Sequence, residues 1–208
     1  MKPIIGISLR ITNAEKYVEK RDSLSHDWPK LIEKIGYVPL LIPNTLSDIP
    51  SFLDEMKVSG LILSGGDNLG DDILRDNTEK KLIDYAISHS IPLVGICRGM
   101  QVINSIFGGN VRLLDNATHV ANPHKVNLNK KFLFSTNSIT VNSFHYNVID
   151  FSNLGNNLTP FAISELDETI EGFLHNTLKI FGVMWHPERN PTSHSIELLK
   201  KIFSSDNK

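Results

Sequence analysis

The chain has 208 residues, and its 21 Lys and Arg residues against 23 Asp and Glu give a formal net charge of −2. That length suits one compact domain over residues 1–208, and no run approaches the roughly 20 apolar residues of a membrane span. The near-neutral charge provides no basic surface for nucleic acid and no attraction to membranes, so a small molecule is the expected partner. A single cysteine excludes an intrachain disulfide and favours a cytoplasmic location.

Apolar strands alternate with amphipathic helices in the first half of the chain. Strands are predicted at 4–9, 38–42, 61–63 and 93–96, and helices at 24–35, 49–56 and 78–88. Pro29 predicts a late start or a kink in the first helix, and Asp76 or Asn77 is expected to cap the third. The alternation predicts an α/β fold in three layers, with a doubly wound, mostly parallel sheet and a site beyond the carboxyl ends of its strands.

Two glycines, Gly65 and Gly66, follow the strand predicted at 61–63. Glycines let the backbone approach a ligand closely, and acyl transfer needs backbone N–H groups aimed at the developing oxyanion. We assign these donors to the amides of Gly66 and Arg98. The alternative is an ordinary glycine turn that closes a strand.

Cys97 lies in the sequence Gly-Ile-Cys-Arg-Gly, between the strand at 93–96 and a helix predicted at 100–107. This G-x-C-x-G pattern has the form of a nucleophile elbow, which holds a side chain out above the sheet. The positive end of the helix dipole favours a thiolate there. A buried core cysteine is the alternative, because lone cysteines are often buried.

Six strands are predicted after the elbow helix, at 111–114, 125–128, 138–141, 161–164, 169–174 and 180–184. They should add an antiparallel extension to the sheet. A final amphipathic helix is predicted at 193–203, covering the sheet.

His119 and His124 are five residues apart, with Asp115 nearby. They lack the i, i+4 spacing of helical metal ligands, and the sequence offers no third strong ligand beside them. We therefore predict no metal site and no cofactor.

His186 and Glu188 end the apolar run at 181–188, just beyond the last predicted strand, and Pro187 between them should turn the chain. A histidine near a thiol can take its proton, and a carboxylate can orient that histidine. With Cys97 they complete the three roles of a catalytic triad. Without a thiol nearby, the pair would be a buried histidine at a strand end and a solvated glutamate.

These three segments resemble the class I glutamine amidotransferase superfamily, in which an oxyanion loop, a nucleophile elbow and a His-Pro-Glu ending occur in this order. The stretch Gly-Ile-Cys-Arg-Gly-Met-Gln at 95–101 is most similar to the γ-glutamyl hydrolase branch, peptidase C26. The resemblance implies a flavodoxin-like fold and hydrolysis of a γ-glutamyl amide through a thioester, with Cys97, His186 and Glu188 as catalytic residues.

Further substrate-binding residues come from the resemblance and from charge. Gln101, one helical turn beyond Cys97, would contact the glutamyl group, and Ser143, Phe144 and His145 would receive its α-amino and α-carboxylate ends. Arg98 and Arg10 could pair with a substrate carboxylate or phosphate, although a surface salt bridge explains Arg10 equally well.

The identity of the cleaved amide stays open. Residues 21–28 and 64–70 look similar to freestanding members found with surface-polysaccharide pathways, which implies γ-glutamyl-CDP-amidate in capsular phosphoramidate synthesis as the substrate. A γ-glutamyl-polyamine or γ-aminobutyrate derivative is a second candidate. The third is glutamine, with ammonia passed to a partner synthetase, and the fourth reading is a non-enzymatic thiol sensor on the same fold. The expected assembly is a monomer or homodimer.

Overall fold

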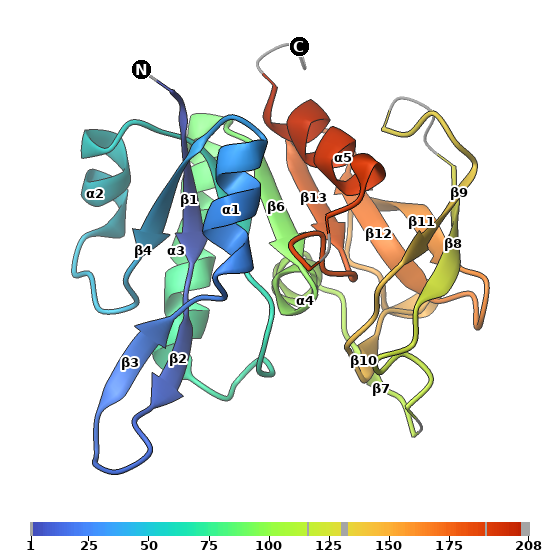
Figure 1. Cartoon of the computed structure of the whole chain (residues 1–208), viewed down its shortest axis with the longest axis horizontal. Coiled ribbons are helices and arrows are strands. Elements are labelled where there is room, and N and C mark those ends of the chain that lie inside the picture. The colour runs from blue at the N-terminus through green and yellow to red at the C-terminus, as the bar shows by residue number, and fades with distance from the viewer. Residues whose placement is uncertain (1, 116, 130–132, 190, 205–208) are drawn as a thin grey trace.

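The computed structural model describes residues 2–115, 117–129, 133–189 and 191–204. Its main feature is a sheet of nine strands (Figure 1). Its parallel half runs in the order β4 (Val38–Ile42), β1 (Ile4–Ser8), β5 (Val58–Leu63), β6 (Leu93–Ile96) and β13 (Ile180–Val183). The antiparallel half continues through β12 (Ile170–His175), β11 (Leu158–Ser164), β8 (His124–Leu128) and β9 (Ser138–Val141). The predicted α/β fold with an antiparallel extension is confirmed.

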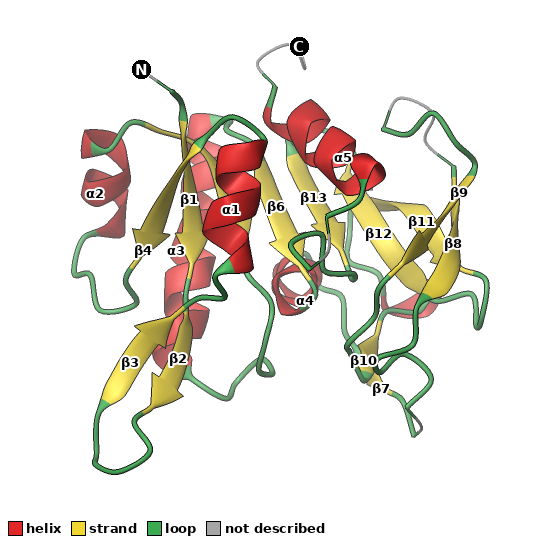
Figure 2. Ribbon diagram, in the orientation of Figure 1, coloured by secondary structure: helices red, strands yellow, loops and turns green. Residues whose placement is uncertain are grey.

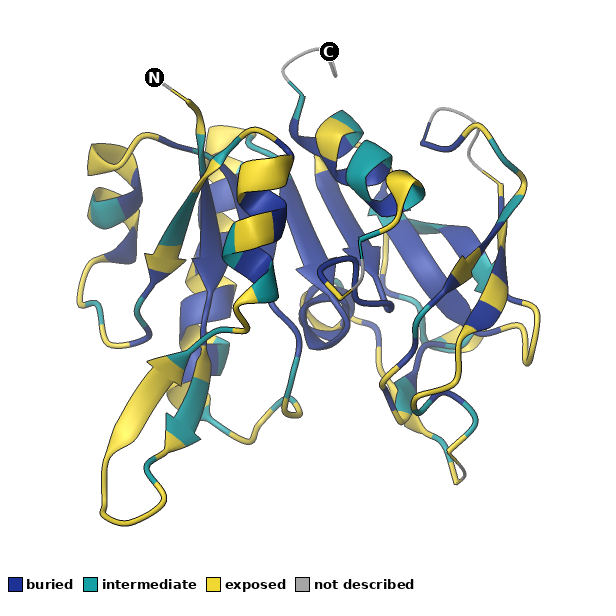
Figure 3. Cartoon of the chain, viewed as in Figure 1, coloured by how far each residue is buried: buried dark blue, intermediate teal, exposed yellow. Residues whose placement is uncertain are grey.

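Helices cover both faces of the sheet. Figure 2 shows α1 (Asp27–Lys34) and α5 (Ser193–Phe203) in front of it and α3 (Ile73–His89) and α4 (Arg98–Ile106) behind, while α2 (Ile49–Glu55) packs beside α3. The central strands are therefore buried from both sides, as Figure 3 shows, and Leu61, Ile62 and Leu63 of β5 are fully buried. This explains why these strands are continuous apolar runs rather than alternating ones.

Two helix starts test the predictions from proline and capping residues. Helix α1 begins at Asp27, so Pro29 lies in its first turn, where no backbone N–H is needed, and the late start is confirmed. Helix α3 begins at Ile73, earlier than predicted, and its cap is Asp72, whose Oδ1 accepts a hydrogen bond of 3.0 Å from the Leu74 amide. Neither Asp76 nor Asn77 is the cap.

The prediction that residues 111–114 form a strand of the main sheet is wrong. Only β7 (Arg112–Leu113) forms there, and it pairs with β10 (Asn147–Val148) in a separate ribbon. Both β7 residues are exposed, so no apolar face drives them onto the sheet. The sequence also did not predict the exposed hairpin of β2 (Arg10–Asn13) and β3 (Lys20–Ser23), or the 3₁₀ turn η1 (Phe151–Asn153).

No helix in the described part of the chain combines the length and apolar character that a membrane span requires.

Candidate active site

Three segments meet where adjacent parallel strands end. Gly65 and Gly66 follow β5, Cys97 follows β6, and His186 follows β13. They border a pocket of about 290 Å³. Besides Gly66, Cys97 and His186, its lining includes Asn68, Gln101, Phe144, Tyr146, Asn147 and Arg189. The convergence follows from the topology, because the carboxyl ends of parallel strands share one edge of a sheet.

Cys97 has the strained backbone of a nucleophile elbow. Its φ of 50° and ψ of −105° are unusual for a residue with a side chain. Its amide donates a 2.8 Å hydrogen bond to the Val183 carbonyl, which ties the turn to β13. A Cβ atom on Gly95 would collide with the Gly99 carbonyl, and one on Gly99 would collide with the Leu63 carbonyl. Both glycines of the motif are therefore required by close packing.

His186 lies between Cys97 and Glu188. Its Nδ1 is 2.7 Å from Oε1 of Glu188, and both side chains are only 4% exposed. Because a carboxylate only accepts, Nδ1 donates this hydrogen bond and the opposite ring nitrogen is free to meet the thiol. Asn142 fixes the backbone, since its Oδ1 accepts from the His186 amide and its Nδ2 donates to the His186 carbonyl, each at 2.8 Å.

The surroundings of His186 favour its charged form. Burial opposes the charge, but hydrogen bonds with Cys97 and Glu188 and their negative charges outweigh it and raise the pKa of His186 to about 9. The folded pKa thus lies above the ordinary value of about 6.5. Protonation of His186 therefore stabilises the fold fully below about pH 6.5, and this contribution is lost as the pH rises through 9.

Glu188→Gln is expected to lower the pKa of His186 toward the ordinary value near 6.5, because it removes the charged partner. The measurement is an NMR titration of the imidazole resonances, with the His186 signal assigned by its loss in His186→Gln. The same Glu188→Gln variant should lose less stability between pH 6.5 and pH 9 than the native chain. An unchanged His186 midpoint in Glu188→Gln would contradict this account.

The loop after β5 packs against His186 and Cys97. A Cβ atom on Gly65 would lie 2.8 Å from His186 Cε1 and 3.4 Å from Cys97 Cβ. The φ of Gly66 is +89°, a conformation that side chains rarely adopt. The Arg75 guanidinium donates to the carbonyls of Ser64, Gly65 and Gly66 at 2.8, 3.0 and 2.9 Å. In a trans peptide the N–H points opposite to the C=O, so Arg75 turns the Gly66 N–H away from itself.

Arg75 belongs to a buried ionic network that sequence reasoning missed. Glu79, fully buried, accepts from Arg75 Nε at 3.0 Å and Ser8 Oγ at 2.8 Å, and also pairs with Arg98. A second carboxylate, Asp76, also pairs with Arg98. The side chain of Arg98 is therefore held by protein carboxylates, whereas its amide is the first of α4 and has no partner within the helix.

Of two other predicted residues, Gln101 lines the pocket and Arg10 lies beside it. Gln101 is 3% exposed, and its backbone N–H donates to the Cys97 carbonyl at 3.2 Å. This bond places Gln101 in the first turn after the elbow. Arg10 lies over Gly66, where its guanidinium pairs with Asp67 through contacts of 2.6 and 3.1 Å. The alternative of a salt bridge for Arg10 is thus present, but at the edge of the pocket.

The three residues predicted to receive the ends of the glutamyl group, Ser143, Phe144 and His145, have different surroundings in the structure. Phe144 lies in the pocket wall, where its ring and the His186 ring pack edge to face with their centres 5.8 Å apart. Ser143 is buried and donates to the His119 carbonyl at 2.5 Å, away from the pocket. His145 borders the pocket but turns one ring nitrogen to Glu171. Arg189, which the sequence did not indicate, stacks on Phe144 with its guanidinium carbon 4.3 Å from the ring centre.

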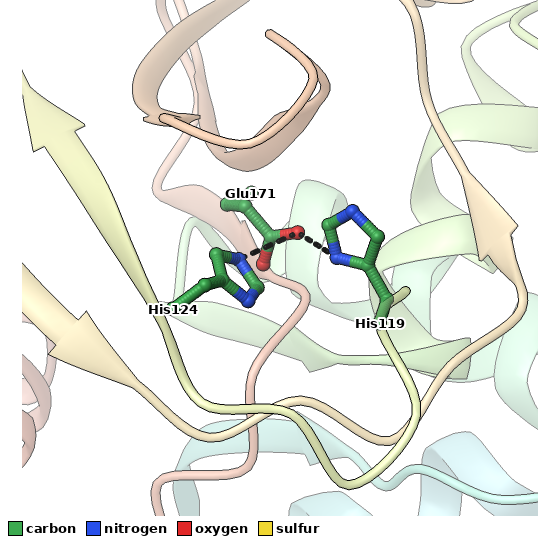
Figure 4. Close-up of side chains that lie close together, drawn as sticks. All are labelled: His119, His124 and Glu171. Carbon is green, nitrogen blue, oxygen red and sulfur yellow. Dashed lines mark ion pairs between the residues drawn. The ribbon is translucent and has the colours of Figure 1, made fainter. Parts of the chain in front are cut away.

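One premise of the metal prediction is wrong. A third side chain able to bind a metal does lie beside His119 and His124, because β12 brings Glu171 between them (Figure 4). Glu171 is 47 residues or more from both histidines in the chain, so no local spacing could have indicated it.

Comparisons with known proteins agree with this architecture. The peptidase C26 family model matches residues 3–188. The chain is 35% identical to the γ-glutamyl-CDP-amidate hydrolase of Campylobacter jejuni, over 96% of this chain and 97% of that one. It is 31% identical to a glutamine-hydrolysing GMP synthase subunit of Pyrococcus abyssi, over 83% of this chain and 88% of that one.

Solved structures share the fold. The crystal structure of a Thermoplasma acidophilum protein described as a GMP synthase subunit matches with a TM-score of 0.74 and 24% identity, over 98% of this chain and 93% of that one. A glutamine amidotransferase of Thermotoga maritima matches with a TM-score of 0.67 and 18% identity, over 90% and 77%. The family match spans both the elbow and the His-Pro-Glu segment, and the chain belongs to the peptidase C26 family.

Proposed function

We propose that this protein hydrolyses the γ-glutamyl amide bond of a small molecule through a thioester on Cys97. The observation that carries the proposal is the line of Cys97, His186 and Glu188 beside a pocket, with the pKa of His186 raised to about 9. A histidine that stays protonated near neutral pH can accompany a thiolate and then deliver a proton. The peptidase C26 family and its γ-glutamyl hydrolase relative support an amide hydrolase.

The first half-reaction forms the thioester. The Cys97 thiolate attacks the γ-carbonyl carbon, and the amides of Gly66 and Arg98 donate to the oxygen as it becomes negative. The C–N bond then breaks, and protonated His186 transfers its proton to the leaving nitrogen. Glu188 keeps the imidazole oriented, and Arg75 holds the loop that carries the Gly66 amide.

The second half-reaction releases glutamate. The leaving group departs, and neutral His186 takes a proton from water as the water oxygen attacks the thioester carbon. The same two amides stabilise the second oxyanion. When the C–S bond breaks, glutamate leaves and the Cys97 thiolate and imidazolium are restored.

For the substrate we propose γ-glutamyl-CDP-amidate, which would place the reaction in capsular phosphoramidate synthesis. The name of the Campylobacter jejuni relative supports this choice. Two half-exposed arginines provide cations suited to a diphosphate: Arg189 in the pocket wall, and Arg10 beside the pocket, where it would have to share its charge with Asp67. A cationic polyamine leaving group would be repelled there, whereas a γ-aminobutyrate leaving group would not.

Glutamine is the second candidate substrate, because a GMP synthase component named as glutamine-hydrolysing is among the relatives. In that case a synthetase would receive the ammonia. The two candidates differ in their products, since γ-glutamyl-CDP-amidate yields glutamate without ammonia.

The test is a panel of γ-glutamyl amides that includes the CDP-amidate conjugate, a γ-aminobutyrate conjugate and glutamine, with glutamate and ammonia assayed separately. We expect the highest kcat/KM for the CDP-amidate conjugate. Arg189→Gln should raise KM for that conjugate about tenfold, with a smaller effect on glutamine, because one charge contact is lost. The exposed Arg21→Gln is the matched control. Equal KM changes for both substrates would contradict the arginine assignment, and no turnover of any amide would favour a thiol sensor.

A further inference from the structure

A buried group of three histidines around one glutamate lies outside the reacting centre. We call His119, His124, His145 and Glu171 the histidine cluster (Figure 4 draws three of its members). His119 and Glu171 are fully buried, and His124 and His145 are each 4% exposed. One nitrogen of each imidazole lies 3.5 Å from the same oxygen, Oε1 of Glu171. The mechanism proposed above uses none of these contacts.

The outer nitrogen of each imidazole faces an oxygen that can only accept a hydrogen bond. The three contacts are His119 Nε2 to Asp167 Oδ2 at 2.9 Å, His145 Nδ1 to the Asn147 carbonyl at 2.9 Å, and His124 Nδ1 to the Asn122 carbonyl at 3.4 Å. Each outer nitrogen therefore carries the ring proton. In the neutral imidazoles the inner nitrogens, which face Glu171, are then bare lone pairs.

Three lone pairs directed at a buried carboxylate repel it. Within the described residues, the inner nitrogens of His119, His124 and His145 and both oxygens of Glu171 have no hydrogen-bond partner. Protonating one ring would give Glu171 a single donor and leave two lone pairs facing it, and protonating all three would bury three cations around one carboxylate, with a large desolvation cost. A single divalent cation accepts all three lone pairs and neutralises the carboxylate at the same time.

We propose that the histidine cluster binds one divalent transition metal ion, with zinc as the best match. Three imidazole nitrogens and one carboxylate oxygen form a donor set typical of zinc, whereas magnesium and calcium prefer oxygen alone. Tetrahedral Zn–N bonds of about 2.0–2.1 Å place ligand atoms roughly 3.3 Å apart. The three nitrogen-to-oxygen distances are 3.5 Å. The ligand atoms of His119, His124 and Glu171 all lie within 4.8 Å of one another, so these three need only a small contraction, and His145 joins them as the fourth ligand through its approach to the same Glu171 oxygen.

The outer contacts have the form of a second coordination shell. Metal-bound histidines usually donate their other N–H to a carboxylate or a backbone carbonyl, which fixes the tautomer and the ring orientation. Asp167 does this for His119, and the Asn147 and Asn122 carbonyls do it for the other two rings. All four ligand side chains are buried, so a bound ion would have no position open to substrate, and its role is structural rather than catalytic.

The metal would hold the wall of the pocket in place. His145 is next to Phe144 and Tyr146, which line the pocket, and its amide donates to the His119 carbonyl at 3.2 Å. Ser143 bonds the same carbonyl. The cluster therefore ties the wall segment to the loop of His119 and to β12, without touching the reacting atoms. This inference does not depend on the proposed hydrolase activity.

Metal analysis of the untagged protein, purified from zinc-supplemented culture, tests the proposal. We expect about one zinc per chain, and a melting temperature that falls by several degrees after chelation and recovers with zinc. Cobalt(II) added to the metal-free protein should give the visible absorption of tetrahedral cobalt. His124→Gln should lose the cobalt spectrum, whereas His89→Gln, an exposed histidine on α3, should keep it.

Two results would overturn the proposal. One is purified protein that contains no metal and binds neither zinc nor cobalt when they are supplied. The other is a cobalt spectrum that survives in His124→Gln. If His124→Gln does not fold, the measurements on the native chain still decide the question.

Discussion

Replacing Cys97 with alanine is expected to lower kcat/KM for the preferred γ-glutamyl amide by about 10⁴-fold or more, because no other group can form the thioester. The fold should survive, since the side chain is small and the elbow is held by Gly95, Gly99 and the Val183 carbonyl. The measurement is steady-state kinetics on purified protein, with circular dichroism to verify folding.

Mass spectrometry after a rapid acid quench provides the second readout for Cys97. A glutamyl adduct should appear on the native chain during turnover and be absent from Cys97→Ala and Cys97→Ser. The His89→Gln variant, at the exposed end of α3 and outside the pocket lining, should keep both activity and adduct. Activity retained in purified Cys97→Ala would exclude the proposed mechanism.

Glu79→Gln is expected to lower the free energy of unfolding by about 3–5 kcal/mol, a large effect for a substitution of equal size. Removing one partner of a buried ionic network leaves the other charges without compensation. Glu79 is fully buried between Arg75 and Arg98, whose side chains are 2% and 1% exposed. Burial already lowers the pKa of Arg75, and the Glu79 charge counteracts that effect.

Urea unfolding measures the effect of Glu79→Gln, and Glu197→Gln is the matched control. Glu197 pairs with Lys201 at 2.7 Å on the surface, where the free energy change should stay within about 0.5 kcal/mol. The folded fraction of Glu79→Gln should also show a lower kcat, because Arg75 loses the partner that orients it under the Gly65 and Gly66 carbonyls. A loss of stability below about 1 kcal/mol would contradict the importance of this network.

Arg98 and Arg10, the two arginines that the sequence predicted as anion binders, have different surroundings in the structure. Both were chosen because a guanidinium suits a carboxylate or a phosphate. Arg98 is paired with the buried Glu79 and with Asp76, whereas Arg10 pairs with the partly exposed Asp67 and stays half-exposed beside the pocket. Their difference depends on α3, whose early start at Ile73 carries Asp76 and Glu79 toward the elbow. The later start predicted for this helix left Asp76 as a cap.

The sequence alone determined the alternating α/β fold, the elbow at Cys97 and the segments that surround it. Apolar runs and glycine turns are local features, and parallel strands bring their carboxyl ends together by topology. Three features were decided only in the tertiary structure: the pairing of β7 outside the main sheet, the support of the Gly65-Gly66 loop by Arg75, and the meeting of Glu171 with three histidines. Each depends on a contact between residues from different elements. The local sequence around a buried charge or imidazole does not indicate which distant residue it will contact.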